Sequence, residues 1–147
     1  AGDEGTVIFL DTNVLIYASD PESPFHRWSV DTIVRHVAGD GALINPVVLA
    51  EICVGEAKPE EAAQSIRSWG IEIVDLPAAC SENCARAYRA FRAARKKTKG
   101  PAAPAIPLPD FFIGAHAELL RLPLATADIG RYRTYFPNVK LLTPPKA

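Results

Sequence analysis

Short apolar runs of β-forming residues alternate with longer segments of helical periodicity, and this alternation restricts the fold more than any other feature of the chain. The runs are residues 6–10, 42–45, 71–76, 123–128 and 139–144. Between them apolar residues recur every three to four positions, which is typical of helices that bury one face. Strands that alternate with helices predict a parallel sheet covered on both faces. We therefore expect an α/β fold, a three-layer α/β/α sandwich around a mostly parallel sheet of about five strands.

Prolines and glycines mark the expected boundaries of the helices. Pro46, Pro59 and Pro77 each suit the first turn of a helix, and Gly70 suits the end of one. The expected helices cover residues 12–19, 25–38, 46–57, 59–70, 77–97 and 110–122. Residues 99–109 contain four prolines, which predict a loop or an extended arm.

Length and composition indicate one domain of balanced charge. The 147 residues are 48% hydrophobic, which is enough for one buried core, so we expect residues 6–147 to form a single domain. Residues 1–5 are read as a tag remnant or a disordered N-terminus. With 16 basic against 17 acidic residues, the net charge of −1 gives no general attraction to nucleic acid or to membranes.

The expected location is the cytoplasm, without contact with a membrane. No apolar run approaches the roughly 20 residues of a membrane span, and the start of the sequence lacks the pattern of a secretion signal. The three cysteines do not have the spacing of a zinc finger, and their odd number fits a reducing compartment better than a disulfide framework.

Two aspartates directly follow or close predicted strands. Asp11 follows residues 6–10, and Asp128 closes residues 123–128. Ligands of parallel sheets gather beyond the carboxyl ends of the strands, which is where both side chains are expected. Each alone is also explained as a helix N-cap, because a carboxylate there accepts hydrogen bonds from unpaired backbone amides.

Two further acids lie within or at the start of predicted helices. Glu51 lies among apolar residues of the segment 46–57, and Asp110 follows Pro109 at the expected start of a helix. Separately they are explained as a surface charge and a cap. Four neighbouring carboxylates would repel one another, and a divalent cation would remove that cost. Oxygen ligands without Cys or His favour Mg²⁺ or Mn²⁺ over zinc.

These residues carry a resemblance to a known family. The run Asp11-Thr12-Asn13 after an apolar strand, Glu51 in "LAEI", Asp110 in "PDFFIGAHA" and Asp128 in "LATAD" resemble the acidic quartet of PIN-domain nucleases. The likeness covers residues 7–144 in order and spacing. The small size is similar to that of the toxin subunits of VapBC-type toxin–antitoxin pairs.

The resemblance implies metal-dependent cleavage of RNA. It makes Asp11, Glu51, Asp110 and Asp128 the catalytic, metal-binding acids, with Mg²⁺ or Mn²⁺ as the cofactor. Asn13 and Thr126 would orient these acids without binding the metal themselves. It further implies an antitoxin partner and a homodimer. An apolar surface around residues 25–30 is the expected dimer contact, with Trp28 either its anchor or part of the core.

A basic segment is the expected site of RNA binding. Residues 86–100 contain no acid, and their basic side chains recur on one face of a predicted helix, an arrangement that suits binding to phosphates. The alternative is a solvated helix face. The residues assigned to RNA are Arg86, Arg89, Arg92, Arg95 and Lys96.

The histidines lie outside the four acidic motifs. His26 and His36 are expected on exposed helix faces, and His116 is expected to be structural.

Two other functions remain open from the sequence. A catalytically inactive PIN-like module would bind RNA or protein without cleaving, and the presence of all four acids disfavours it. A phosphohydrolase of the haloacid-dehalogenase type also begins with an Asp after its first strand. Its chemistry needs a second Asp two residues later, where this chain has Asn13.

Overall fold

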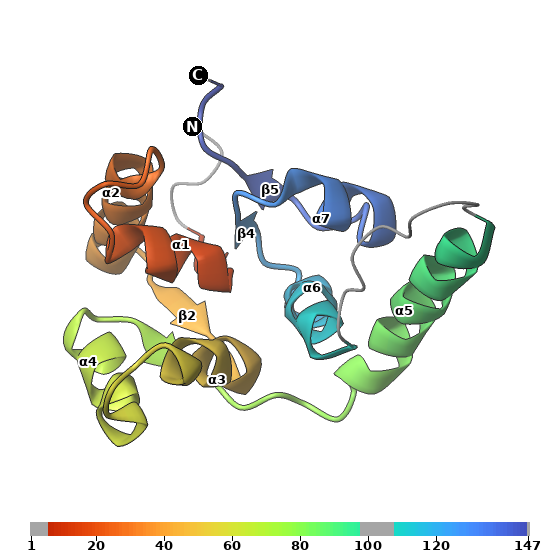
Figure 1. Ribbon diagram of the computed structural model, residues 1–147, viewed down its shortest axis with the longest axis horizontal. Coiled ribbons are helices and arrows are strands. Elements are labelled where there is room, and N and C mark those ends of the chain that lie inside the picture. Colours follow the sequence, from red (N-terminus) through yellow and green to blue (C-terminus); the bar gives the residue numbers. More distant parts are fainter. Residues whose placement is uncertain (1–5, 98–107, 147) are drawn as a thin grey trace.

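The computed structural model describes residues 6–97 and 108–146 and contains one sheet of five parallel strands in the order β3-β2-β1-β4-β5 (Figure 1). The strands are β1 (Ile8–Leu10), β2 (Ala42–Ile44), β3 (Glu72–Ile73), β4 (Leu124–Ala125) and β5 (Leu141–Leu142). The helices of the described residues are α1 (Thr12–Ala18), α2 (His26–Ala38), α3 (Pro46–Val54), α4 (Ala62–Ser68), α5 (Cys80–Lys97), α6 (Leu108–Leu120) and α7 (Ile129–Tyr135). The expected α/β fold with a five-stranded sheet is confirmed, and every strand pair is parallel.

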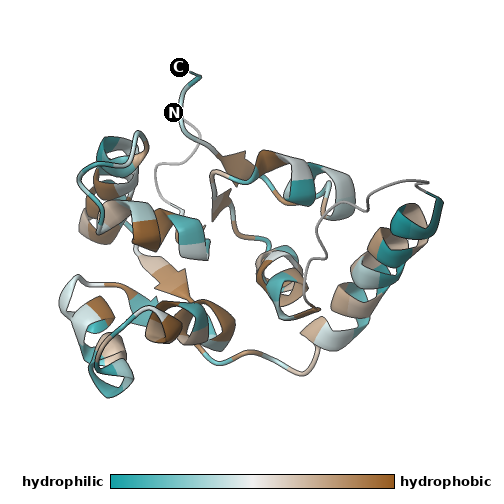
Figure 2. Cartoon of the chain, in the orientation of Figure 1, coloured by the Kyte–Doolittle hydropathy of each residue, from teal (hydrophilic) through white to brown (hydrophobic). Residues whose placement is uncertain are grey.

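Strand β1 lies at the centre of the sheet and is fully buried. It pairs with β2 on one side and with β4 on the other. Helices α1, α2 and α4 lie on one side of the sheet, and α5 and α6 lie on the other (Figure 1). Strands β2, β4 and β5 are hydrophobic, whereas the C-terminal end of α5 is strongly hydrophilic (Figure 2). This central position explains why "IFL" has no polar residue: both faces of β1 are covered.

Local sequence signals explain where several helices begin and end. Asn45 caps α3, because its side-chain oxygen accepts a hydrogen bond from the Val48 amide at 3.1 Å, and Pro46 occupies the first turn. Gly70 follows α4 with φ +90°, a left-handed conformation that favours glycine.

The ends of two helices differ from expectation. Helix α5 begins at Cys80 rather than at Pro77. Helix α6 begins at Leu108, so Pro109 lies in its first turn, where the missing amide costs nothing, and Asp110 is its third residue. Of the proline-rich segment, residues 98–107 lie outside the described residues, as do residues 1–5.

One short helix has no counterpart in the sequence prediction. Helix α7 lies between β4 and β5, and its Tyr132 is completely buried. Phe136, which ends α7, packs directly against Gly114 of α6, where an added methyl group would overlap the phenyl ring. The close approach at Gly114 thus holds α6 and the end of α7 together.

In the part of the chain that the structure describes, none of the helices combines the length and the apolar character needed to cross a membrane.

Candidate active site

Asp11 lies at the carboxyl end of β1 and caps α1, with only 3% of its surface exposed. Its Oδ1 accepts a hydrogen bond from the Thr12 amide at 2.8 Å. Its Oδ2 accepts from the hydroxyls of Thr126 at 2.7 Å and Tyr132 at 3.0 Å, and from the amide group of Asn13 at 3.1 Å. Burial raises the pKa of Asp11 above its usual range, and these hydrogen bonds oppose the rise. One lone-pair direction of Oδ1 remains without a protein donor among the described contacts.

The pairing of β1 with β4 brings these distant residues together. Leu10 lies opposite Ala125, so the residues that follow each strand, Asp11 and Thr126, emerge side by side. Asn13 spans the same junction, because its Oδ1 accepts a hydrogen bond from the Ala127 amide at 3.2 Å. The structure therefore places Asn13 and Thr126 in direct contact with Asp11.

Glu51 and Asp110 form a second pair of carboxyls, contributed by α3 and α6. The Thr12 hydroxyl donates to Glu51 Oε1 at 2.8 Å, which ties α1 to α3. Glu51 is exposed as a whole residue, but its carboxyl is partly withdrawn from water and lies near that of Asp110. Desolvation raises the pKa of Glu51, and the negative charges of Asp110 and Asp11 raise it further. Glu51 therefore lies close enough to Asp110 and Asp11 for their negative charges to act on it.

Asp128 and Asp110 are linked by a cation that the sequence analysis did not identify. Arg131 Nη2 lies 3.1 Å from Asp128 Oδ2, and its Nη1 lies 3.9 Å from Asp110 Oδ2. The Arg131 guanidinium also lies over the Tyr132 ring, 5.8 Å from its centroid. Asp128 is the residue before α7, yet its side chain makes no capping hydrogen bond.

Burial and negative neighbours set the charge states of Arg131 and Tyr132. Burial opposes the charge of Arg131, but its acidic neighbours and Tyr132 outweigh that effect, so its pKa is raised and it stays positive. Burial and the neighbouring Asp11 raise the pKa of Tyr132 well above its ordinary value, which keeps the phenol protonated as a donor to Asp11.

The four acids are the type of ligand that a hard cation prefers, but their side chains are not arranged in a metal-binding geometry. All are oxygen donors, as Mg²⁺ and Mn²⁺ prefer. Within residues 6–97 and 108–146, however, no three acidic, histidine or cysteine side chains lie together in a way that could hold a metal ion. Asp11 is engaged by hydrogen-bond donors, and Asp110 and Asp128 by Arg131. A bound cation would have to compete with these partners for the carboxylates.

The histidines lie away from this cluster. His116 is buried, and its Nδ1 lies 3.2 Å from Asn45 Nδ2. The prediction that His36 is exposed is wrong: it is 5% exposed, and its Nδ1 donates to the Thr32 carbonyl at 2.8 Å, which satisfies the ring inside the molecule. His26 is only partly exposed, with Nδ1 3.0 Å from the Tyr17 carbonyl.

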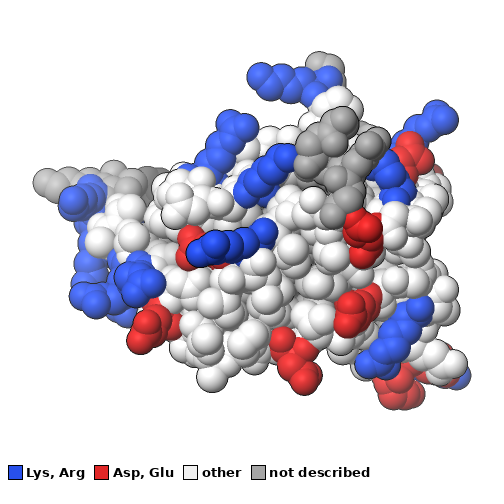
Figure 3. Space-filling view, turned by 180° about the vertical axis from the view of Figure 1, so that it is seen from behind, with Lys and Arg blue, Asp and Glu red and all other residues white. Residues whose placement is uncertain are grey.

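Helix α5 presents basic side chains beside the elements that carry the acids. It packs on α6 and α7 and buries Phe91 among aromatic rings of the core. Arg86, Arg89, Arg92 and Lys96 are exposed, whereas Arg95 is half-buried with its guanidinium 5.7 Å from the centre of the Phe91 ring. Lys and Arg gather over the end of the molecule where α5 lies (Figure 3).

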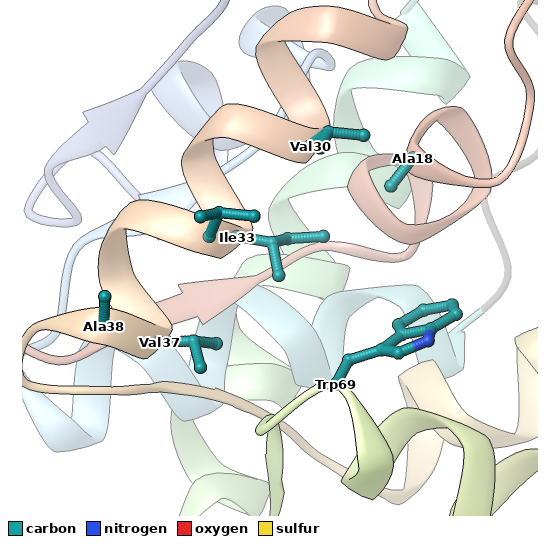
Figure 4. A pocket seen from close by; sticks show the side chains of 7 residues that line it. Ala18, Val30, Ile33, Val37, Ala38 and Trp69 are labelled. Carbon is teal, nitrogen blue, oxygen red and sulfur yellow. The ribbon is translucent and has the colours of Figure 1, made fainter.

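An apolar hollow of about 580 Å³ lies on the other side of the sheet, between α1, α2 and the end of α4. Val30, Ile33 and Val37 of α2 face it, with Trp69 across from them (Figure 4). Trp69 is 45% exposed and also lines an adjacent hollow that reaches Glu51. Trp28 is half-buried and packs against the core, so it offers little surface as a dimer anchor.

Comparison with known proteins gives a family match over most of the chain. The model of the family described as PIN domain matches residues 8–137. A search of curated protein sequences gave no match.

Several solved structures have similar folds. FitAcB from Neisseria gonorrhoeae has a TM-score of 0.64 and 22% identity, with 93% of this chain and 97% of that chain covered. DNA-bound VapBC from Salmonella typhimurium has a TM-score of 0.62 and 18% identity, covering 94% and 98%. Mycobacterium tuberculosis VapC20, described as a toxin that cleaves the sarcin-ricin loop, has a TM-score of 0.60 and 14% identity, covering 90% and 98%. At these identities the likeness shows the fold.

Proposed function

Because this chain belongs to the PIN domain family, we propose that it is a metal-dependent endoribonuclease, the toxin of a toxin–antitoxin pair, that hydrolyses RNA phosphodiester bonds. The observation that carries the proposal is the convergence of acids from four separate elements of the chain. The negative charges of Asp110 and Asp11 raise the pKa of Glu51, and Arg131 links Asp110 to Asp128. Bringing like charges together costs free energy, so a cluster of acids favours a functional site over a purely structural one.

The proposed metal ligands are Asp11, Glu51, Asp110 and Asp128. When bound there, Mg²⁺ or Mn²⁺ supplies charge neutralisation for the phosphate and a water molecule activated at neutral pH. Thr126, Tyr132 and Asn13 hold the Asp11 carboxylate in a fixed orientation. Thr12 performs the same task for Glu51. We propose that these four residues orient the metal-binding acids, since each donates a hydrogen bond to one of them.

RNA is the proposed substrate, and the exposed basic residues of α5 are its proposed contacts. Arg86, Arg89, Arg92 and Lys96 are exposed on α5, and Arg95 is half-buried on the same helix. Because α5 packs on α6 and α7, a backbone bound along α5 would continue toward Asp110 and Asp128. Positive side chains on this surface compensate for a net charge of −1, which by itself attracts no polyanion.

An antitoxin is the proposed protein partner. Among similar folds, FitAB and the VapBC2 of Rickettsia felis are described as bound to DNA fragments, and a Klebsiella pneumoniae structure as a toxin–antitoxin complex. In this chain the apolar hollow between α2 and α4 offers a surface for apolar side chains of such a partner. Val34, which lines this hollow, is 60% exposed and adds apolar surface to it.

The haloacid-dehalogenase interpretation is set aside because the family match and the carboxamide at Asn13 both oppose it. An inactive RNA- or protein-binding module remains the alternative outcome of the test below.

The test is RNA cleavage by Glu51→Gln and Asp110→Asn. Each change removes a charge with almost no change of shape, so both variants should fold and lose cleavage by about 100-fold or more. Cleavage of a structured RNA is measured in Mn²⁺ and in EDTA, with circular dichroism to confirm folding. Asp31→Asn, an exposed acid on α2, is the matched control and should cleave like the wild type.

Cleavage that survives in both variants, or that persists in EDTA, would contradict the assignment of the acids. RNA binding without cleavage by the wild-type protein would favour the inactive module.

A further inference from the structure

Arg131 is the one basic side chain that the described contacts place inside the acidic cluster. Its side chain is 19% exposed, and it pairs with Asp128, which precedes α7, and with Asp110 of α6. The pair with Asp110 is largely withdrawn from water, because the Asp110 side chain is only 17% exposed, whereas the Asp128 side chain is 41% exposed.

The four acids are balanced by two different means. Asp11 receives four hydrogen bonds from uncharged donors, and Glu51 receives one from Thr12. Asp110 and Asp128 instead share the positive charge of Arg131. One positive charge of the chain itself thus partly compensates the two negative charges of Asp110 and Asp128.

We propose that Arg131 is a built-in counter-ion that holds Asp110 and Asp128 while no metal is bound and competes with a divalent cation for both carboxylates. This inference rests on the proposed function, since it takes the two aspartates as metal ligands. It accounts for the arrangement of the cluster, in which oxygen donors of the right kind are present without three of them gathering around one point.

The contacts of Arg131 are of a kind that a divalent ion can replace. Only the Asp128 contact is short, at 3.1 Å, whereas the Asp110 contact is 3.9 Å. The guanidinium Nε is buried and has no hydrogen-bond partner in the described structure, so Arg131 does not use its full donor fork on either acid. A divalent cation carries twice the charge of Arg131 and interacts with each carboxylate more strongly at the same distance.

The competition has two measurable consequences of opposite sign. Without Arg131 the metal-free protein keeps uncompensated negative charge, so its melting temperature should fall. The same loss removes a positive charge beside the incoming cation, so the affinity for the cation should rise. A residue that merely supported the fold would lower both.

The experiment is Mn²⁺ binding by isothermal titration calorimetry at low ionic strength, together with thermal melting in EDTA, for wild type and Arg131→Gln. We expect Arg131→Gln to bind Mn²⁺ about tenfold or more tightly than wild type and to melt at a lower temperature in EDTA. Arg133→Gln is the matched control, because Arg133 lies on the same helix, carries the same charge and is exposed. It should bind Mn²⁺ within about twofold of wild type.

Arg131→Lys covers the case in which the glutamine variant does not fold. Lysine keeps the charge but cannot present two donors to two carboxylates in one plane, so we expect tighter Mn²⁺ binding than wild type by a smaller factor. Unchanged or weaker binding in the folded variants would overturn the inference while leaving the proposed nuclease intact. No Mn²⁺ binding by the wild-type protein would overturn the metal-dependent function and the inference with it.

Discussion

Asp11 performs two tasks that are alternatives in sequence reasoning. Its Oδ1 caps α1 through the Thr12 amide, while its Oδ2 collects three side-chain donors inside the molecule. A simple cap would leave the second oxygen in water, because one backbone hydrogen bond is all that a cap requires. The donors from β4 and α7 therefore distinguish Asp11 from a purely structural residue.

Buried His116 should make the stability of the protein depend on pH. Burial lowers its pKa below the ordinary value of 6.5, so the folded protein resists protonation that the unfolded chain accepts. Stability contributed by neutral His116 is complete above about pH 6.5 and is lost as pH falls from there toward the folded pKa. Urea unfolding at about pH 7.5 and about pH 5.5 should show a smaller difference between the two pH values in His116→Gln than in wild type. An equal difference in both proteins would mean that His116 does not contribute.

At the scale of elements, the contact between Gly114 and Phe136 determines how closely α6 can approach the end of α7. Gly114→Ala should destabilise the protein by about 1–3 kcal/mol, since the added methyl group meets the ring of a completely buried phenylalanine. Gly130→Ala is the control, because a methyl group there meets open space and should be neutral or stabilising by up to about 1 kcal/mol. Urea denaturation measures both. Equal stability of the two variants would show that α6 can move away from Phe136 at no cost.

Helix α5 supplies the second prediction at this scale. Replacing Arg89 and Arg92 together by Gln should weaken RNA binding for all sequences and reduce the slope of log affinity against log salt by about 1–2. The matched control replaces Arg27 and Arg35 of α2, which are exposed on the other side of the sheet. Filter binding over a range of salt concentrations measures the slopes. If both pairs behaved alike, α5 would be an ordinary solvated helix.

The elements also show how far the sequence predicts this molecule. The five strands lie within the apolar β-forming runs predicted for them, because such runs bounded by turn residues have few other structures. Strand β4 ends at Ala125, however, so Asp128 precedes α7 and does not close the strand as expected. The start of α6 was misplaced because Pro109 was read as a break, although proline is tolerated in a first helical turn.

Helix α7 carries the part of the site that sequence reasoning missed. Its seven residues give too short a period to recognise, and Asp128 before it lacks a capping hydrogen bond. Without a predicted helix at this place, the sequence does not position Arg131 beside the acids. In the sequence alone, an arginine that is exposed cannot be distinguished from one that pairs with buried acids.

At the scale of the whole molecule, the exposed apolar side chains fall into separate groups. Val34 and Trp69 border the hollow beside α2, whereas Val54, Leu119 and Leu120 lie at the ends of α3 and α6. We predict a homodimer that leaves the hollow open for the proposed antitoxin. Sedimentation velocity at micromolar concentration should therefore give a dimer for wild type and also for Val34→Glu. A monomer throughout would contradict the dimer, and a dimer lost only in Val34→Glu would place the hollow in the contact between copies.

The order of strands in the sheet has a consequence for synthesis. β1 precedes the other described strands in the chain and lies at the centre, but its partner β4 and the donors Thr126 and Tyr132 come from the last quarter of the described chain. At about 5–20 residues per second, translation separates Asp11 from Thr126 by several seconds to some tens of seconds. For most of that interval the growing chain lacks Asp110, and throughout it the chain lacks Asp128 and the hydroxyls that order Asp11. A ribosome that stalls before β4 consequently releases a fragment in which the acidic cluster has never assembled.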